Sequence, residues 1–191
     1  MSAPVLHVLA GPNGSGKSTF AHEVLQPITH LPFVNADEIA AQRWPGEEEQ
    51  HAYDAAAAAA EARARALRSG ASFIAETVFS HPSKVELVQQ AVALGYLVEL
   101  HVMLVPEDLA VARVAYRVEG GGHTVPEEKV RERYRRLWRL IAEATRVAHR
   151  AHFYDNSRAD AFRRVAGFEL GRPAGTPTWP AWTPRPLIAR L

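Results

Sequence analysis

The stretch AGPNGSGKSTF, residues 10–20, decides the fold, because residues 11–18 match the phosphate-loop pattern G-x-x-x-x-G-K-[ST] at every fixed position. An apolar run at residues 4–10 precedes the pattern and predicts a buried strand. After the pattern we expect a helix from Lys17 to about Leu25, stopped before Pro27. Such a loop turns its N–H groups around phosphate oxygens, and the helix directs its positive end at the same anion. A nucleoside triphosphate is therefore the expected ligand.

The pattern assigns a task to each residue of this loop. The Lys17 ammonium is suited to bridge the outer phosphates, and the Ser18 hydroxyl is suited to ligate Mg²⁺. ATP and Mg²⁺ are accordingly the expected cofactors. The predicted ATP-binding residues are Gly11, Pro12, Asn13, Gly14, Ser15, Gly16, Lys17, Ser18 and Thr19.

The composition limits the class of protein. A chain of 191 residues, 47% of them apolar, can form one α/β domain with a substantial core. We expect that domain over residues 1–170, followed by a tail at 171–191 that is rich in proline and tryptophan. The absence of cysteine excludes disulfides and thiolate metal sites, and the nine histidines show no HExxH spacing, so no zinc site is predicted.

The start of the chain and its hydropathy predict where the protein is found. The first residues, MSAPVLHVLAG, lack the basic segment and long apolar run of a signal peptide. No stretch approaches the roughly 18 apolar residues that a membrane span requires. A cytoplasmic protein without a membrane partner is the expectation.

Strand and helix patterns alternate along the chain. Strands are expected at residues 4–10, 31–37, 72–76, 96–105 and 152–157. Helices are expected at residues 47–69, 82–94, from 106 onward and at 126–150, with the tail as an irregular wrap. Alternation of this kind predicts an α/β fold with a parallel sheet flanked by helices. We expect the three-layer, P-loop kinase-like form of that fold.

The phosphate loop alone leaves two fates for the transferred phosphate. The string GPNGSGKST is common in ABC-type ATPases, which hydrolyse ATP to drive movement. The chain lacks an LSGGQ-like signature, a run of four apolar residues ending in Asp-Glu, and a later histidine switch. A kinase that transfers the phosphate to a small molecule is therefore favoured over a motor.

Two acidic residues follow predicted strands and could serve a kinase. Asp37 ends the second strand, where it could orient or deprotonate an acceptor hydroxyl. Glu76 ends the strand SFIAE and could contact the substrate hydroxyl or Mg²⁺ from its second shell. The alternatives are that NADE caps the next helix and that Glu76 is merely solvated. Glu38 is the less favoured neighbour of Asp37.

Two arginines precede a glycine-rich break. Arg113 and Arg117 are four residues apart and so share one face of a helix, directly before EGGGHT at residues 119–124. This arrangement predicts a small glycine-hinged lid, about residues 113–130, whose arginines offset phosphate charge during catalysis. Surface salt bridging is the alternative for both side chains.

Positive charge gathers in the last third of the chain. Residues 126–191 carry 14 Lys/Arg against 7 Asp/Glu, and Arg131, Arg135 and Arg139 form a stripe on the expected helix. A solvated helix face is the favoured explanation, so nucleic acid is not an expected partner. The alternative function is a regulatory P-loop NTPase that binds RNA or a protein through this helix without small-molecule phosphotransfer.

Taken together, the segments AGPNGSGKST, FVNADEIA, IAETVFS, GYLVELHVMLV, RVAYRVEGGGHTVPEEKVRERY and YDNS resemble the zeta-toxin family of P-loop kinases, in its short chromosomal form. The likeness covers roughly residues 4–158. It implies a fold similar to nucleotide and shikimate kinases. It also implies transfer of the ATP γ-phosphate to a hydroxyl of a nucleotide sugar, such as UDP-N-acetylglucosamine, and a protein antitoxin as partner.

The resemblance also implies roles for individual residues. Lys17 and Ser18 match the phosphate and magnesium positions, and Asp37 matches the catalytic base. Glu76 matches the acidic residue at a strand end, and Glu61 falls near a glutamate that contacts substrate. Arg113 matches a phosphate-binding arginine, with Arg117 as the candidate for the second. The implied catalytic residues are Asp37, Lys17, Arg113 and Arg117, and the implied substrate-binding residues are Asp37, Glu61 and Glu76.

Overall fold

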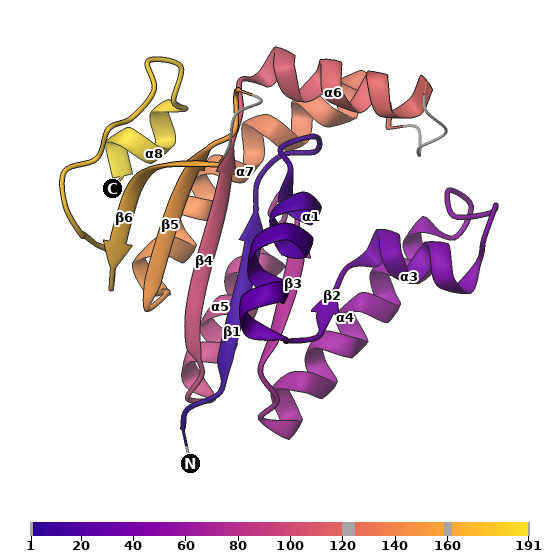
Figure 1. Ribbon diagram of the computed structural model, residues 1–191, viewed down its shortest axis with the longest axis horizontal. Helices are drawn as coiled ribbons and strands as arrows, with labels where there is room; N and C mark the ends of the chain where they lie inside the picture. Colours follow the sequence, from indigo (N-terminus) through magenta and orange to yellow (C-terminus); the bar gives the residue numbers. More distant parts are fainter. Residues whose placement is uncertain (1, 120–124, 159–161, 191) are drawn as a thin grey trace.

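The chain builds a seven-stranded sheet with the strand order β2-β3-β1-β4-β5-β6-β7 (Figure 1). The computed structural model describes residues 2–119, 125–158 and 162–190. Neighbouring strands from β2 to β5 are parallel, whereas β6 and β7 add antiparallel pairs at one edge. The strands are β1 (Val5–Ala10), β2 (Phe33–Val34), β3 (Phe73–Thr77), β4 (Leu97–Leu104), β5 (Arg150–Asp155), β6 (Arg163–Glu169) and β7 (Arg172–Pro173).

Helices cover both faces of the sheet, with α1 on one face and α5 and α7 on the other (Figure 1). This is the three-layer, P-loop kinase-like α/β fold that the sequence predicts. The helical elements are α1 (Lys17–Phe20), the π-helix η1 (Ala21–Leu25), α2 (Gln26–Thr29), α3 (Ala36–Arg43), α4 (Ala52–Ser69), α5 (Ser83–Ala93), α6 (Glu107–Glu119), α7 (Glu127–Val147) and α8 (Arg185–Arg190).

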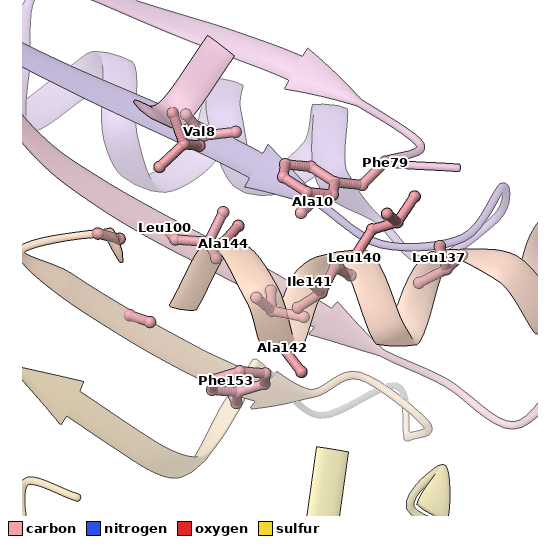
Figure 2. Close-up of a cluster of buried hydrophobic side chains, with 14 of the residues drawn as sticks. Val8, Ala10, Phe79, Leu100, Leu137, Leu140, Ile141, Ala142, Ala144 and Phe153 are labelled. Atoms are coloured by element: carbon pink, nitrogen blue, oxygen red, sulfur yellow. The ribbon is translucent and has the colours of Figure 1, made fainter. Parts of the chain in front are cut away.

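The larger core lies between the sheet and α7. Figure 2 shows side chains of α7, among them Ile141 and Ala144, close to Val8 of β1 and Leu100 of β4. All four are fully buried. Alternation along β1 sends Leu9 to the opposite face, where it packs with Phe20 and the rest of a smaller cluster under α1. The two clusters fix β1 from both sides and so hold the start of the phosphate loop.

The helix after the phosphate loop and the second strand differ from the sequence prediction. The helix that follows the loop does not stop before Pro27 but continues as η1 and α2 to Thr29. Pro27 is accommodated because the π-helical turn η1 directly before it interrupts the regular α-helical hydrogen bonding. The second strand spans only Phe33–Val34, because Asn35 already caps the helix α3.

The helix predicted for residues 47–69 begins later, at Ala52 rather than Glu47. Trp44 stacks on His51 with ring centroids 4.6 Å apart, and His51 also contacts the Asp54 carboxylate at 2.8 Å. These contacts keep the residues between Trp44 and His51 in turns, so helical hydrogen bonding starts only after them.

The end of the chain contains more regular structure than the predicted irregular wrap. Strand β6 was not predicted, because two arginines and a glycine obscure its alternation, although Val165 and Phe168 are buried. Helix α8 also lies in the predicted tail, and its Leu187 is fully buried. Trp179 and Trp182 pack against the larger core. In the described ranges, no helix combines the length and the apolar character needed to cross a lipid bilayer.

Replacing Ile141 by alanine tests the importance of the α7 layer. We expect Ile141→Ala to lower the free energy of unfolding by about 2–5 kcal/mol, because the side chain is fully buried and leaves a cavity. Arg139→Ala on the same helix removes an exposed side chain, and its effect should stay within about 0.5 kcal/mol. Urea unfolding of both variants measures the difference, and equal losses would contradict this account of the core.

Candidate active site

The phosphate loop joins β1 to α1 in a conformation that requires glycine. Gly14 and Gly16 have φ angles of 72° and 88°, in the left-handed region. A Cβ atom on Gly14 would lie 2.8 Å from the carbonyl oxygen of Ala110, and one on Gly16 would collide with the Asn156 amide. The loop is therefore packed closely between α6 and the turn after β5. Thr19 is exposed, one residue beyond Ser18 on α1.

Lys17 lies folded back over this loop. Its Nζ donates to the Pro12 carbonyl oxygen at 3.0 Å and lies 3.6 Å from Oε1 of Glu76. Only 5% of the Lys17 surface is exposed. Burial lowers the pKa of Lys17, and the Arg117 charge adds to this, while the carboxylates of Glu76 and Asp37 oppose it. A buried ammonium group in this position is suited to bind an anion such as a phosphate group.

Glu76 is the centre of the polar contacts at the end of β3. Its Oε2 accepts hydrogen bonds from the Ser18 hydroxyl at 2.7 Å and from the Asn35 amide at 2.8 Å. Its Oε1 faces Lys17. The carboxylate thus joins the phosphate loop to the ends of β2 and β3. Ser18 and Glu76 together offer oxygen donors, the ligands that Mg²⁺ prefers.

Asp37 lies at the start of α3, but it is not the residue that caps the helix. Asn35 takes that position, and its Oδ1 accepts from the N–H groups of Asp37 at 2.7 Å and Glu38 at 3.4 Å. The Glu38 carboxylate is occupied by His22, 2.8 Å away. Asp37 is exposed, and within the described part of the chain its carboxylate accepts no hydrogen bond. It remains available to a ligand beside Lys17.

Helix α6 brings the two predicted arginines to the loop. Nη1 of Arg113 donates to the carbonyl oxygen of Asn156 at 2.9 Å, and the Asn156 amide donates to the Ser15 carbonyl at 2.9 Å. Arg117 is exposed one turn later, with its charge close enough to act on Lys17. Part of the predicted lid, residues 120–124, lies outside the described residues.

Glu61 is not brought to this cluster. It lies on α4 with 76% of its side chain exposed, and it pairs with Arg65 at 3.7 Å, one turn along the same helix. The structure therefore gathers Lys17, Ser18, Asp37 and Glu76 at the strand ends and leaves Glu61 on an outer helix face.

The basic helix α7 is largely compensated by acidic neighbours. Arg131 contacts Asp108 at 2.8 Å and Glu127 at 2.8 Å, and these hydrogen bonds raise its pKa. Arg135 lies 3.7 Å from Glu107, and Arg139 lies 3.7 Å from Glu143. The predicted stripe is therefore a solvated face with ion pairs, which gives no support to an RNA-binding surface.

Two asparagines of the site were not predicted as functional residues. Asn35 and Asn156 each follow a strand, and each ties a neighbouring segment to the phosphate loop or to Glu76. Both residues directly follow a strand, and strand ends line the ligand crevice in sheets of this kind. That position could have indicated a role in the site.

The loop geometry, strand order and clustered charges define a P-loop nucleotide-binding protein with a kinase-like fold. Residues 6–136 match the family model described as AAA domain, and the chain belongs to that family. No protein of curated function matches the sequence.

Solved structures with a similar fold include the AvrRxo1-ORF1:AvrRxo1-ORF2 complex, a chromosomal toxin–antitoxin system and a gluconokinase. The AvrRxo1-ORF1:AvrRxo1-ORF2 complex with sulphate ions matches with a TM-score of 0.69 and 20% identity over 90% of this chain. The PezAT chromosomal toxin–antitoxin system of Streptococcus pneumoniae matches with a TM-score of 0.62 and 19% identity, covering 82% of this chain and 70% of the other. A gluconokinase from Sinorhizobium meliloti 1021 matches with a TM-score of 0.53 and 19% identity, covering 83% and 86%.

These likenesses concern the fold. The chain spans 60% of the length of the matched AvrRxo1 chain, and all three identities lie at or below 20%. Kinases recur among the neighbours, since a shikimate kinase from Acinetobacter baumannii in complex with shikimate also matches, with a TM-score of 0.52.

Substituting Gly16 tests the close packing of the phosphate loop. Gly16→Ala should lose more stability than the roughly 1–2 kcal/mol that a left-handed backbone costs, because its Cβ would also meet Asn156. Gly46→Ala is the matched control, because its φ is 85° but nothing lies within 4 Å of its Cβ. Urea unfolding compares the two. We also expect Gly16→Ala alone to weaken binding of a fluorescent ATP analogue, and equal behaviour of the variants would contradict the packing argument.

Proposed function

We propose that the protein is an ATP- and Mg²⁺-dependent kinase that phosphorylates an alcohol group of a small molecule. The observation that carries the proposal is the different engagement of two carboxylates, Glu76 at the end of β3 and Asp37 at the start of α3. Glu76 is fully engaged with Ser18, Asn35 and Lys17, whereas the Asp37 carboxylate, whose charge also acts on Lys17, is exposed and accepts no hydrogen bond among the described residues. One carboxylate therefore organises the phosphate loop, and the other is free to receive a hydroxyl.

The residues present suit the two cofactors. The N–H groups of residues 13–18 and the Lys17 ammonium can hold the ATP phosphates. The Ser15 hydroxyl oxygen and Oδ1 of Asn13 are buried in this loop without a hydrogen-bond partner in the described structure. Ser18 would ligate Mg²⁺ directly, with Glu76 holding Ser18 from the second shell. Bound Mg²⁺ would supply positive charge at the transferring phosphoryl group.

Phosphoryl transfer then follows from the positions of the remaining side chains. Asp37 orients the acceptor hydroxyl and takes its proton as the new oxygen–phosphorus bond forms. The bond between the γ-phosphorus and the β–γ bridging oxygen breaks, so that ADP leaves with the electron pair. Lys17, Arg113 and Arg117 offset the charge that spreads over the phosphoryl oxygens.

We propose a nucleotide sugar, such as UDP-N-acetylglucosamine, as the class of acceptor. Support comes from the resemblance of the sequence segments to zeta toxins and from the fold match with the PezAT toxin–antitoxin system. The same two observations support a protein antitoxin as a partner. Glu61 stays a proposed substrate contact from the resemblance, and its side chain is exposed on α4, where it pairs with Arg65.

Replacing Asp37 tests the assignment of the catalytic base. Asp37→Ala should reduce phosphate transfer by about 10²–10⁴-fold, the usual contribution of a general base, while the affinity for ATP stays nearly unchanged. Glu38→Ala is the matched control, because its carboxylate is held by His22 and should not contribute to transfer. The assay incubates each protein with ATP, Mg²⁺ and a panel of nucleotide sugars and detects a mass gain of one phosphate.

Two results would contradict the proposal. Transfer by Asp37→Ala at the normal rate would remove Asp37 as the base. ATP hydrolysis with no phosphorylated product across nucleotide sugars, simple sugars and shikimate-like alcohols would favour a regulatory NTPase instead. Phosphorylation of another alcohol in the panel would keep the kinase and replace only the nucleotide sugar.

The buried Lys17 predicts that nucleotide binding is linked to a proton. Burial lowers the pKa of Lys17 below its ordinary value of 10.5, and bound phosphates should raise it again. Between these two pKa values, free protein binds fewer protons than the complex, so ATP binding takes up a proton. The affinity should therefore fall as the pH rises through this alkaline range.

Titration calorimetry at one alkaline pH, in two buffers with different ionisation enthalpies, measures the proton uptake. Lys17→Arg is the control, because arginine stays protonated throughout and should show no uptake at this position. Equal uptake by the wild type and the variant would contradict the role assigned to Lys17.

A further inference from the structure

A row of imidazoles crosses the sheet on the face that α1 covers. His7 of β1, His101 of β4 and His152 of β5 lie side by side, with ring centroids separated by 5.3 Å and 5.6 Å. Glu99 precedes His101 by two residues and so points to the same face, directly beside His7 in the strand register. Covered faces of parallel sheets are normally apolar. A polar row in this position therefore needs a physical explanation.

The side chains of His7, Glu99 and His101 bring three possible metal-ligand atoms close together. Nδ1 of His7 lies 3.1 Å from Nε2 of His101 and 3.7 Å from Oε2 of Glu99. All three donor atoms lie within 4.8 Å of one another. Zinc bonds of about 2.0–2.1 Å at tetrahedral angles separate neighbouring donors by ~3.3–3.4 Å. Two of the three separations bracket that value, and the third, between Glu99 and His101, lies within 4.8 Å, so the Glu99 carboxylate would move toward His101 to complete the set.

The surroundings of the cluster favour neutral imidazoles. His7 and His101 are 8% and 4% exposed, and burial lowers the pKa of each. Neutral imidazole is the form that binds metal. Nδ1 of His7 and Nε2 of His101 face each other, and a pair of neutral imidazoles can share at most one hydrogen bond there.

The second oxygen of Glu99 is held from outside the cluster. Nη1 of Arg150 lies 3.3 Å from Oε1 of Glu99, whereas Oε2 faces His7. An ion could therefore bind Oε2 without displacing the arginine, and Arg150 would orient the carboxylate as outer partners of metal ligands commonly do.

We propose that His7, Glu99 and His101 form a binding site for a divalent transition metal ion of the Zn²⁺ class. Two imidazole nitrogens and one carboxylate oxygen make a three-ligand set that leaves a position for water. The set differs from the oxygen donors of Ser18 and Glu76, which suit Mg²⁺. His7 is three residues before the end of β1, so the site is about 10 Å along the strand from the phosphate loop.

A metal at this place would join β1 to β4 and touch the loop indirectly. The Phe20 ring lies 5.6 Å from the His101 ring, and Phe20 ends the short helix α1 that begins at Lys17. The bound ion would hold His101 in one orientation under Phe20. The role is therefore structural support of the strand and helix that flank the phosphate loop, separate from phosphate transfer.

A metal-binding titration tests the site without reference to kinase activity. Untagged protein is stripped with a chelator and titrated with Zn²⁺ against a chromophoric competitor, with excess Mg²⁺ and without ATP. We expect one tight equivalent of Zn²⁺ per chain. Glu99→Gln and His101→Gln should each weaken binding by at least the roughly 10–100-fold loss seen when a mere outer partner of a ligand is removed.

His51→Gln is the matched control, because His51 lies between Glu47 and Asp54 at 3.6 Å and 2.8 Å on the surface and could hold zinc adventitiously. It should bind Zn²⁺ like the wild type. Zinc should also raise the melting temperature of the wild type and of His51→Gln but not of Glu99→Gln. Circular dichroism establishes that each variant is folded, and His7→Gln replaces any variant that is not.

Three outcomes would overturn the proposal. The first is the absence of tight Zn²⁺ binding by the wild type. The second is unchanged affinity in folded Glu99→Gln and His101→Gln, which would locate the ion elsewhere, including at the phosphate loop. The third is loss of the bound equivalent in His51→Gln alone.

Discussion

The Glu76 carboxylate is the constraint on which the candidate active site depends. Its side chain is 11% exposed, and it lies opposite a lysine that is almost fully buried. Two buried opposite charges are costly to remove from water, and only good geometry and further hydrogen bonds offset that cost. The Ser18 hydroxyl and the Asn35 amide provide those bonds. The carboxylate therefore holds loop, helix and strand ends in one arrangement before any ligand arrives.

Because Asn35 caps helix α3, the neighbouring acidic residues Asp37 and Glu38 can make different contacts. Because its Oδ1 satisfies the first N–H groups of α3, neither Asp37 nor Glu38 is needed as a cap. His22 takes Glu38, and the Asp37 carboxylate is left exposed beside a buried cation. A short amide at the end of β2 thus leaves one acid available for a reacting hydroxyl. The same asparagine donates to Glu76, so its position also depends on the loop being correctly formed.

Sequence patterns predicted the parts of the molecule that follow local rules. The phosphate loop, the order of strands and helices and the parallel sheet follow from periodicity, glycine placement and strand-end chemistry. The helix boundaries near Pro27 and Ala52 could not be predicted in this way. A π-helical turn carries the first helix past its expected end, and the stacking of Trp44 on His51 delays the start of the second. Strand β6 escaped because Arg163, Arg164 and Gly167 mask its alternation.

Within the site, the sequence indicated which residues lie at strand ends but not how they pair. Glu76 and Asp37 were both expected there, yet their different engagement depends on Asn35 and His22, which come from other turns. The cluster of His7, His101 and His152 could not be predicted from the sequence for a related reason. His7 and His101 are 94 positions apart, and only the parallel pairing of β1 with β4 brings them together. Spacing rules detect ligands on one helix, not ligands on adjacent strands.

The structure explains the excess of positive charge in the last third of the chain. Acidic residues of α6 lie against arginines of α7, so that Glu107 and Asp108 together meet Arg131 and Arg135. The excess positive charge of residues 126–191 is therefore partly neutralised by acidic side chains of the same molecule. Salt screens the remaining surface charges, so they attract a polyanion only weakly. The cations that remain directed at the phosphate loop are different ones, Lys17, Arg113 and Arg117. In the proposed reaction these cations, rather than the arginines of α7, would offset the charge that develops during phosphoryl transfer.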